Sequence, residues 1–550
     1  MPTTLCQLHR DACRRLGVAT AIRFRRNGVY QDLSWHDYRQ AADHAAAGLI
    51  SLGLSPGDRV AILSENRLEW LLADHAMLSA ATVTVPLHAP LSVAQVSFQL
   101  SHSGARAVFV SDQNQADKVT QVLAELPDLR WLIHFDSINI TGNITGRVET
   151  LSWKQLADGA SPTDHETIAR READLRGDSL ATIIYTSGTT GDPKGVMLSH
   201  DNVLSNALGT AAAVEFGPDD VMLSWLPYSH VYARTVDHYL STQLGSTLAL
   251  AESLDTLLDD LAEIQPTWMN GVPRFYEKVW AKVESLSPDD RRQALHSIFG
   301  PRFKQLSSGG APLPGHVCRG FNEAGIPLLE GYGLTESSPV ISFNSRARNR
   351  LGTVGPAIKG VEIRIAPDGE ILTRGPHVMQ GYWKNDAATA EVIVDGWLKT
   401  GDVGELDADG YLSITDRKKD LMITSTGKNI APGQIERLLA SDPDIDQAVL
   451  YGDGRSYLTA LVVPNFERLA QLDHEIQSTG GIVSTPAIIA HYQQRINALM
   501  QSVSGPEQVK KFLLLDRPLQ MADEELTATQ KVRRRFVTAK YETQLAALYD

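Results

Sequence analysis

The most informative segment of this sequence reads Ile183-Ile184-Tyr185-Thr186-Ser187-Gly188-Thr189-Thr190-Gly191-Asp192-Pro193-Lys194-Gly195-Val196. An apolar run typical of a strand leads into hydroxyl side chains and glycines, and one lysine closes the loop. Small residues let backbone N–H groups approach an anion, hydroxyls donate further hydrogen bonds, and the lysine adds a full positive charge. The segment therefore predicts a strand that ends in a phosphate-binding loop, with candidate ligands Thr186, Ser187, Gly188, Thr189, Thr190, Gly191 and Lys194.

Strand-like and helix-like segments alternate around this loop through the first 400 residues. Helical patterns include 35–52 and 254–264. The strand-like runs lie at 59–63, 82–86, 107–110, 131–134, 182–185, 221–225 and 247–250. Such alternation predicts an α/β fold in which helices cover parallel sheets.

The pattern changes at about Gly352 to short strands separated by turn residues. Asp368-Gly369 and Asp409-Gly410 each stand between two strand-like runs, as in tight antiparallel hairpins. The charged run 416–420 follows, and strands and helices alternate again beyond it. We therefore expect a large N-terminal domain of parallel α/β sheets with a small antiparallel β region, followed by a smaller α+β C-terminal domain. The expected boundaries are 1–416 and 417–550.

The composition excludes several classes of protein. The 550 residues are 43% apolar and 21% charged, as in globular proteins rather than disordered or fibrous ones. Against 65 Asp and Glu stand 51 Lys and Arg, and the net charge of −14 argues against nucleic acid as a partner. Three cysteines without C-x-x-C spacing indicate a reducing compartment. With no signal-peptide pattern and no apolar run of about 18 residues, a cytoplasmic protein is expected.

A second glycine-rich motif, Gly331-Tyr332-Gly333-Leu334-Thr335-Glu336, follows an apolar run. A dinucleotide fingerprint is excluded, because Glu336 occupies its last position. Together with the loop at 183–196, the motif resembles the nucleotide-binding motifs of the adenylate-forming superfamily, which includes the acyl-CoA synthetases. The resemblance implies that Tyr332 lies against the adenine and that Thr335 reaches the α-phosphate. The nucleotide contacts expected from this motif are Gly331, Tyr332, Gly333 and Thr335.

The same resemblance implies a magnesium site at Glu336, with Thr186 as a second ligand. This assignment suits the chemistry, because a hard cation prefers a carboxylate together with phosphate oxygens. The segment 396–402 is similar to the superfamily's ribose-binding element, in which Asp402 accepts hydrogen bonds from both ribose hydroxyls. Arg417 corresponds to a further nucleotide contact.

The C-terminal region extends the resemblance to nearly the whole chain, from about residue 20 to 545. Lys419 corresponds to the hinge of a mobile C-terminal domain, and 427–436 is similar to the loop near the thioester-forming site. Lys531 corresponds to the lysine that contacts the carboxylate and the α-phosphate during adenylation. Around it, Ala528 and Gln530 depart from the pattern of the long-chain enzymes.

Three segments most resemble long-chain fatty acyl-CoA synthetases, namely 226–235, 272–279 and 307–313. The third borders the acyl tunnel in that subfamily, and Gly310 and Ala311 within it are expected at the nucleotide. Tyr276 corresponds to a gating aromatic, although a core aromatic is an equally good interpretation. His230 is either a structural histidine or a residue that orients the acyl carboxylate.

The resemblance implies ATP, Mg²⁺ and coenzyme A as cofactor and cosubstrates, and a fatty acid as the substrate. The acid attacks ATP to give acyl-AMP and pyrophosphate, and the CoA thiol then releases AMP. Two alternatives remain, an acyl-AMP ligase that loads a carrier protein and a nucleotide-binding regulator without turnover. Cations at 510–511 and 533–535 would allow peripheral contact with the inner face of an anionic membrane.

Overall fold

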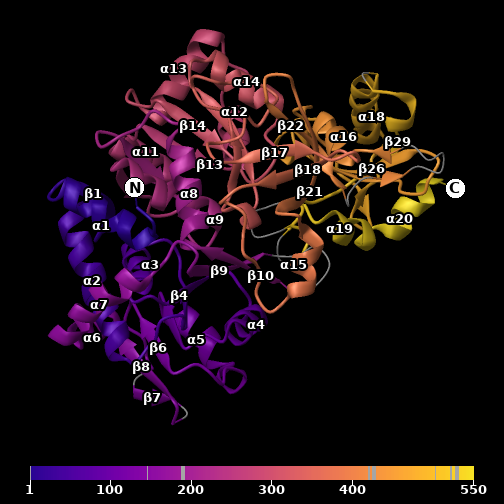
Figure 1. Ribbon diagram of the computed structural model, residues 1–550. Helices are drawn as coiled ribbons and strands as arrows, with labels where there is room; N and C mark the ends of the chain where they lie inside the picture. Colours follow the sequence, from indigo (N-terminus) through magenta and orange to yellow (C-terminus); the bar gives the residue numbers. More distant parts are fainter. Residues whose placement is uncertain are drawn as a thin grey trace.

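The computed structural model describes residues 2–140, 142–144, 146–186, 193–418, 422–423, 429–472, 474–501, 503–520, 523–526 and 532–549. Two large sheets and a small antiparallel sheet form the N-terminal part, and a smaller α+β domain lies beside them at the C-terminal end (Figure 1). The predicted fold class is therefore confirmed. In the described part of the chain, no helix combines the length and the apolar character needed to span a bilayer.

One large sheet carries the strand that leads into the predicted phosphate-binding loop. Its inner strands are parallel, and β10, β19 and β7 are antiparallel additions at its two edges. Its strand order is β19 (Gly381–Tyr382), β10 (Lys194–Ser199), β9 (Leu180–Thr186), β4 (Val83–Leu87), β3 (Arg59–Leu63), β5 (Ala107–Val110), β6 (Trp131–His134), β8 (Val148–Ser152) and β7 (Gly142–Ile144).

The second large sheet carries the Gly331–Glu336 motif at the end of β15. Its central strands are also parallel, with antiparallel β16 and β2 at the edges. Its strand order is β16 (Val340–Phe343), β15 (Leu328–Gly333), β14 (Gln305–Ser308), β13 (Trp268–Gly271), β11 (Val221–Ser224), β12 (Thr247–Leu250), β1 (Thr20–Arg26) and β2 (Val29–Ser34).

Helices cover these sheets and begin where capping residues allow. The Ser34 hydroxyl, for example, accepts a hydrogen bond from the Asp37 N–H at 3.0 Å, and this N-cap starts α2. The helices of the N-terminal part are α1 (Leu5–Leu16), α2 (Trp35–Ser51), α3 (Leu68–Ser79), α4 (Val93–Ser103), α5 (Gln113–Thr120), α6 (Trp153–Asp158), α7 (Pro162–Asp174), α8 (His200–Ala211), α9 (Val231–Ala233), a π-helical turn (Arg234–Tyr239), α10 (Leu240–Leu244), α11 (Leu257–Ile264), α12 (Pro273–Ala281), α13 (Pro288–Phe299), α14 (Gly315–Glu323) and α15 (Asp386–Val392).

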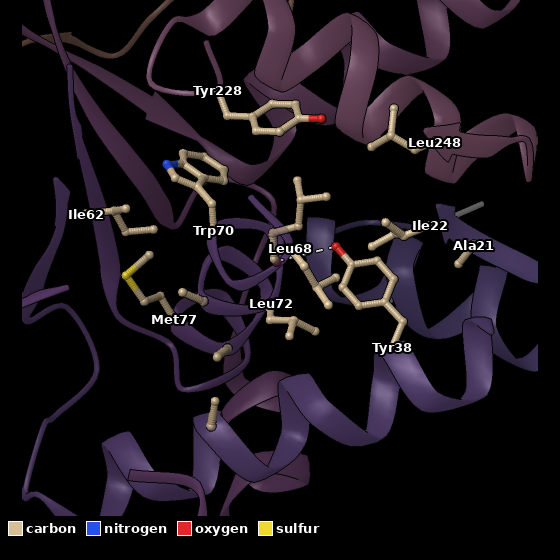
Figure 2. Packing of buried hydrophobic residues seen from close by; sticks show 14 of the residues in the cluster. Ala21, Ile22, Tyr38, Ile62, Leu68, Trp70, Leu72, Met77, Tyr228 and Leu248 are labelled. Atoms are coloured by element: carbon tan, nitrogen blue, oxygen red, sulfur yellow. Dashed lines mark hydrogen bonds between the residues drawn. The ribbon is translucent and has the colours of Figure 1, made fainter. Parts of the chain in front are cut away.

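The main core lies between the two large sheets. Ile62 of one sheet and Leu248 of the other belong to a single cluster of buried side chains (Figure 2). Trp70 of α3 and Tyr228 are almost completely buried there, with ring centroids 5.2 Å apart. Because helices and strands from both sheets share this core, the two sheets are held in a fixed relation.

The small antiparallel sheet contains both predicted hairpins. Its strands are β17 (Glu362–Ile365), β18 (Glu370–Arg374), β21 (Trp397–Leu406), β20 (Ile393–Val394) and β22 (Leu412–Arg417). The turn glycines Gly369 and Gly410 have φ values of 85° and 82°, as the Asp-Gly pairs predicted.

Of the charged run at 416–420, the structure describes Asp416, which is buried, Arg417, which is partly buried, and Lys418, which is exposed. Asp416 is only 8% exposed and accepts the backbone N–H of Gly433 at 2.7 Å. Lys418 donates to Asp368 and Glu370 at 2.7 and 2.8 Å. Charge density alone predicts exposure, but these groups are paired across the small sheet and α16 (Pro432–Leu439).

The C-terminal domain is built on a three-stranded sheet of β25 (Ile445–Tyr451), β26 (Leu458–Pro464) and β29 (Val509–Leu514). Its remaining elements are β23 (Met422–Ile423), β24 (Asn429–Ile430), α17 (Phe466–Leu469), β27 (Ser478–Thr479), β28 (Ile482–Val483), α18 (Pro486–Met500), α19 (Arg534–Lys540) and α20 (Glu542–Ala546). The basic segment 533–535 is not wholly exposed, because Arg534 forms an ion pair with Glu436 at 2.6 Å.

Candidate active site

The predicted phosphate-binding loop lies between two adjacent antiparallel strands in the sequence. Thr186 ends β9, Lys194 begins β10, and the two residues pair across the hairpin. The Thr186 hydroxyl donates to the Lys194 carbonyl at 3.5 Å. Ser187, Gly188, Thr189, Thr190 and Gly191 lie outside the described residues, but both ends of their loop are placed.

A tyrosine that the sequence analysis did not select contacts both Lys194 and Glu336. The Lys194 ammonium lies over the Tyr382 ring, 4.9 Å from its centroid. The Tyr382 hydroxyl donates to Glu336 Oε1 at 2.9 Å. Burial and the Glu336 carboxylate both raise the pKa of Tyr382, so the phenol remains a donor. No local pattern marks Tyr382, because its contacts are with distant segments.

The glycines of the second motif are required by close packing. A Cβ atom at Gly331 would lie 2.9 Å from a ring carbon of Phe343, and one at Gly333 would lie 1.8 Å from the Pro339 carbonyl oxygen. Because neither position carries a Cβ atom, β15 can pack closely against β16. Thr335 and Glu336 follow immediately in a short 3₁₀ turn, Thr335–Ser337, and this turn directs Glu336 to Tyr382.

Tyr332, Asp402 and Arg417 form a second group beside the first. Asp402 is 5% exposed, accepts from the Tyr332 hydroxyl at 2.7 Å and accepts from Arg417 Nε at 2.9 Å. Burial and the neighbouring Asp402 raise the pKa of Tyr332 well above its usual range. Each carboxylate oxygen can accept more than one hydrogen bond, so Asp402 retains the capacity to accept a ligand hydroxyl.

The group around Glu336 and the group around Asp402 are adjacent, because Tyr332 and Glu336 stand four positions apart at the end of β15. Gly310 and Ala311 follow β14, the parallel neighbour of β15, so they lie at the same edge of the sheet. The structure therefore brings Thr186, Lys194, Glu336 and Asp402 to one region, as a shared nucleotide requires.

His230 lies close to the same edge of the second large sheet, because its neighbour Tyr232 packs there. Its Nδ1 accepts from the Tyr232 N–H at 3.1 Å, which caps α9. The Tyr232 ring in turn lies close to Gly309, where a Cβ atom would approach it to 3.0 Å. His88, which the sequence analysis also missed, has its ring centroid 6.4 Å from that of His230, and burial lowers its pKa.

Tyr276 is a core aromatic in this structure. It is fully buried, and its hydroxyl donates to the Ser307 carbonyl at 2.8 Å. A Cβ atom at Gly271 would lie 2.7 Å from the same hydroxyl, so glycine is needed there. Of the two interpretations left open by the sequence, the structure supports a core aromatic that packs against the ends of β13 and β14.

Lys419 and Lys531 lie outside the described residues. The residues that flank the Lys531 segment, Leu526 and Val532, form an isolated antiparallel bridge. Among the described residues, no group of three or more His, Cys, Asp or Glu side chains could enclose a metal ion. Glu336 and Thr186 offer a carboxylate and a hydroxyl oxygen, and a Mg²⁺ ion there would take its other oxygen ligands from phosphate and water.

Comparison with known proteins identifies the family to which the chain belongs. The AMP-binding enzyme family matches residues 9–383, and the AMP-binding enzyme C-terminal domain matches residues 419–550. The chain belongs to the AMP-binding enzyme family.

Individual relatives agree with this assignment. The chain is 33% identical to the long-chain-fatty-acid–CoA ligase FadD15 of Mycobacterium bovis, over 95% of this chain and 93% of the relative. It is 30% identical to the peroxisomal long chain acyl-CoA synthetase 6 of Arabidopsis thaliana, over 93% and 81% of the two chains. The crystal structure of ATP-bound MatB from Rhodopseudomonas palustris matches with a TM-score of 0.78 and 26% identity, over 98% and 99% of the two chains.

Proposed function

We propose that the chain is an AMP-forming long-chain fatty acid–CoA ligase. The observation that carries this proposal is the meeting of Lys194, Glu336 and Asp402 around the end of β15, in a chain similar over nearly its whole length to long-chain acyl-CoA ligases. The proposed domains are 1–416, which binds ATP and the acid, and 417–550, which turns at Lys419 and carries Lys531.

Each side chain of the site has a role that follows from charge. A carboxylate must approach a polyphosphate, and this repulsion has to be compensated. Lys194 and the N–H groups of its loop would hold the phosphates, and Lys531 would reach the carboxylate and the α-phosphate. Thr335 would donate to that phosphate, and His230 would orient the acid. Oriented donors of this kind commonly change kcat by about 100- to 1,000-fold.

The nucleoside is held at the other end of the site. Asp402 would accept the ribose hydroxyls, Arg417 would fix Asp402, and Tyr332 would lie beside the adenine with Gly310 and Ala311. Glu336, with Thr186, would hold a Mg²⁺ ion on the phosphates, where the ion would neutralise negative charge on the leaving pyrophosphate. The carboxylate and hydroxyl ligands fit this hard cation.

The two half-reactions provide the test. Acids from acetate to very long chains are screened for pyrophosphate release, with and without CoA, and AMP and the acyl thioester are measured. We expect a maximum at long-chain acids and thioester formation that requires CoA. Product that forms only on a carrier protein would identify the alternative ligase, and no pyrophosphate with any acid would identify a binding protein.

Lys531→Ala separates the two steps. We expect this variant to lose acyl-AMP formation by at least about 100-fold, because a single oriented cation is removed from the developing charge. Transfer from preformed acyl-AMP to CoA does not use that cation and should continue. Equal losses in both half-reactions would contradict the role proposed for Lys531.

A cytoplasmic location with peripheral membrane contact is proposed for the same enzyme. Lys510 and Lys511 are exposed and supply positive charge for an anionic lipid surface, whereas Arg534 is held by Glu436. Flotation with anionic vesicles, compared with neutral vesicles, tests this contact.

A further inference from the structure

Tyr382 stands between the two oppositely charged side chains of the site. Its ring faces the Lys194 ammonium at 4.9 Å, and its hydroxyl donates to Glu336 Oε1 at 2.9 Å. The side chain is 6% exposed. Lys194 and Glu336 are both described, and they form no direct ion pair in this structure, although each contacts the same tyrosine.

The backbone around Tyr382 is held in place on both sides. Its N–H donates to the Thr389 hydroxyl at 2.9 Å, and Val196 of β10 pairs with it across the sheet edge. Gly381 has a φ of 144°, and a Cβ atom there would lie 2.7 Å from Thr389 Cγ2. The position of Tyr382 is therefore fixed by these backbone and packing contacts, and not only by its contacts with Lys194 and Glu336.

The same segment is also bonded to the backbone that carries the carboxylate. The Met379 N–H donates to the Glu336 carbonyl at 2.9 Å. β10, which begins with Lys194, is the neighbour of β19 in the sheet. Lys194, Tyr382 and Glu336 thus occupy one rigid corner, where the distance between the charges is set by the aromatic ring.

A direct ion pair between these groups would oppose both of their proposed roles. An ammonium that is neutralised by a carboxylate interacts less with phosphate, and a carboxylate held by an ammonium binds a cation less well. The face of an aromatic ring attracts an ammonium more weakly than a carboxylate does, so the lysine stays available. The phenol hydrogen bond orients one oxygen of Glu336 and leaves the other for a cation.

We propose that Tyr382 is a positioning residue that keeps Lys194 and Glu336 apart, so that one can bind phosphate while the other binds the metal ion. This inference rests on the function proposed above. It assigns two separable parts to the side chain: the ring is the spacer, and the hydroxyl orients the carboxylate.

Two substitutions separate these parts. Tyr382→Phe keeps the ring and loses the donor, so we expect about a three- to tenfold higher Mg²⁺ concentration at half-saturation, with metal-free ATP binding unchanged. Tyr382→Leu removes the ring and allows Lys194 to pair with Glu336. In that variant we expect metal-free ATP to bind at least about tenfold more weakly, which corresponds to about 1.4 kcal/mol. Both affinities are measured by titration calorimetry with ATP, with and without Mg²⁺.

The decisive measurement is a rescue. Adding Glu336→Gln to Tyr382→Leu removes the competing carboxylate, and we expect metal-free ATP affinity to return to within about threefold of the unmodified protein. A tyrosine that only packs against its neighbours would give no rescue. Tyr30→Phe is the matched control, because the Tyr30 hydroxyl also donates to a carboxylate, Asp260 Oδ1, at 2.7 Å away from this site.

Failure of the inference and failure of the proposed function are distinguishable. If Lys194→Gln and Glu336→Gln each leave MgATP binding unchanged, the roles proposed for those residues are wrong. If both weaken binding but the Tyr382 variants match the Tyr30→Phe control, the spacer role alone is wrong. Rescue in the double variant, together with weakened binding in Tyr382→Leu, supports both.

Discussion

Substitution of Asp74 by asparagine should destabilise the N-terminal part far more than loss of a surface ion pair. Asp74 is completely buried and accepts from Arg234 Nη2 at 2.5 Å and from the Tyr239 hydroxyl at 2.6 Å. Arg234, also buried, donates to Thr182 on β9 and to Thr84 on β4, at 2.7 Å each. The pair therefore ties α3 and the π-helical turn to the strand that leads into the phosphate loop.

The expected magnitude follows from burial. Removing one partner of a buried ion pair leaves an uncompensated charge and costs about 3–5 kcal/mol. Asparagine keeps one acceptor oxygen, so the lower value, about 3 kcal/mol, applies to Asp74→Asn. With an unfolding entropy of about 2.1 cal/mol/K per residue over roughly 400 residues, this cost lowers the melting temperature by about 3–4 °C.

The assay is calorimetric unfolding of Asp74→Asn beside Asp32→Asn. The control residue Asp32 accepts from Arg23 at 2.7 Å, but their side chains are 45% and 33% exposed. Exposed pairs contribute about 0–1 kcal/mol, so the control should lower the melting temperature by about 1 °C or less. Equal melting temperatures for the two variants would refute the argument that Arg234 depends on Asp74 for its charge compensation.

Two further predictions concern the domain contact and acid stability. Arg274 of α12 donates to both oxygens of Asp446 in the C-terminal domain, at 2.7 and 3.0 Å. Arg274→Ala should therefore change the ratio of the two half-reaction rates by about two- to fivefold. Adding Asp446→Ala should cause no further change, because the two residues share one contact. Independent effects of the two substitutions would contradict a shared contact. Burial lowers the pKa of His377 to about 4, so its unfolded form binds the proton first, and stability is lost as the pH falls from about 6.5 towards 4. Between pH 7 and 5, the free energy of unfolding of His377→Gln should therefore fall by about 2 kcal/mol less than that of the unmodified protein, as measured by denaturant unfolding. An equal fall in the two proteins would show that His377 is not the group that titrates.

Local sequence patterns predicted several strands and turns of the fold. The bounds of β3, β5, β6 and β12 agree with the predicted strands, and the Asp-Gly pairs stand at the turns of the small sheet. These features depend on side-chain alternation and turn chemistry over a few neighbouring residues, so a single sequence contains the information. The phosphate-binding loop could be predicted for the same reason, because its glycines, hydroxyls and lysine are contiguous.

Contacts between distant segments were not predictable in this way. Tyr382 was missed because nothing beside it in the chain indicates that it meets Lys194 and Glu336. Arg234 lies in a segment that was noted only for its resemblance, and its pairing with Asp74 appears only when α3 and β9 pack together.

The amino-acid sequence by itself predicted which residues bind phosphate, ribose and a metal ion, through the chemistry of contiguous side chains and through the resemblance of whole motifs to known nucleotide-binding ones. Only the tertiary structure decided which charged groups are paired and which are not, as in Lys194 and Glu336, which both contact Tyr382 without pairing directly. The physical reason is that electrostatic interaction depends on distance and burial, and both are set by how separate strands meet at one edge of a sheet.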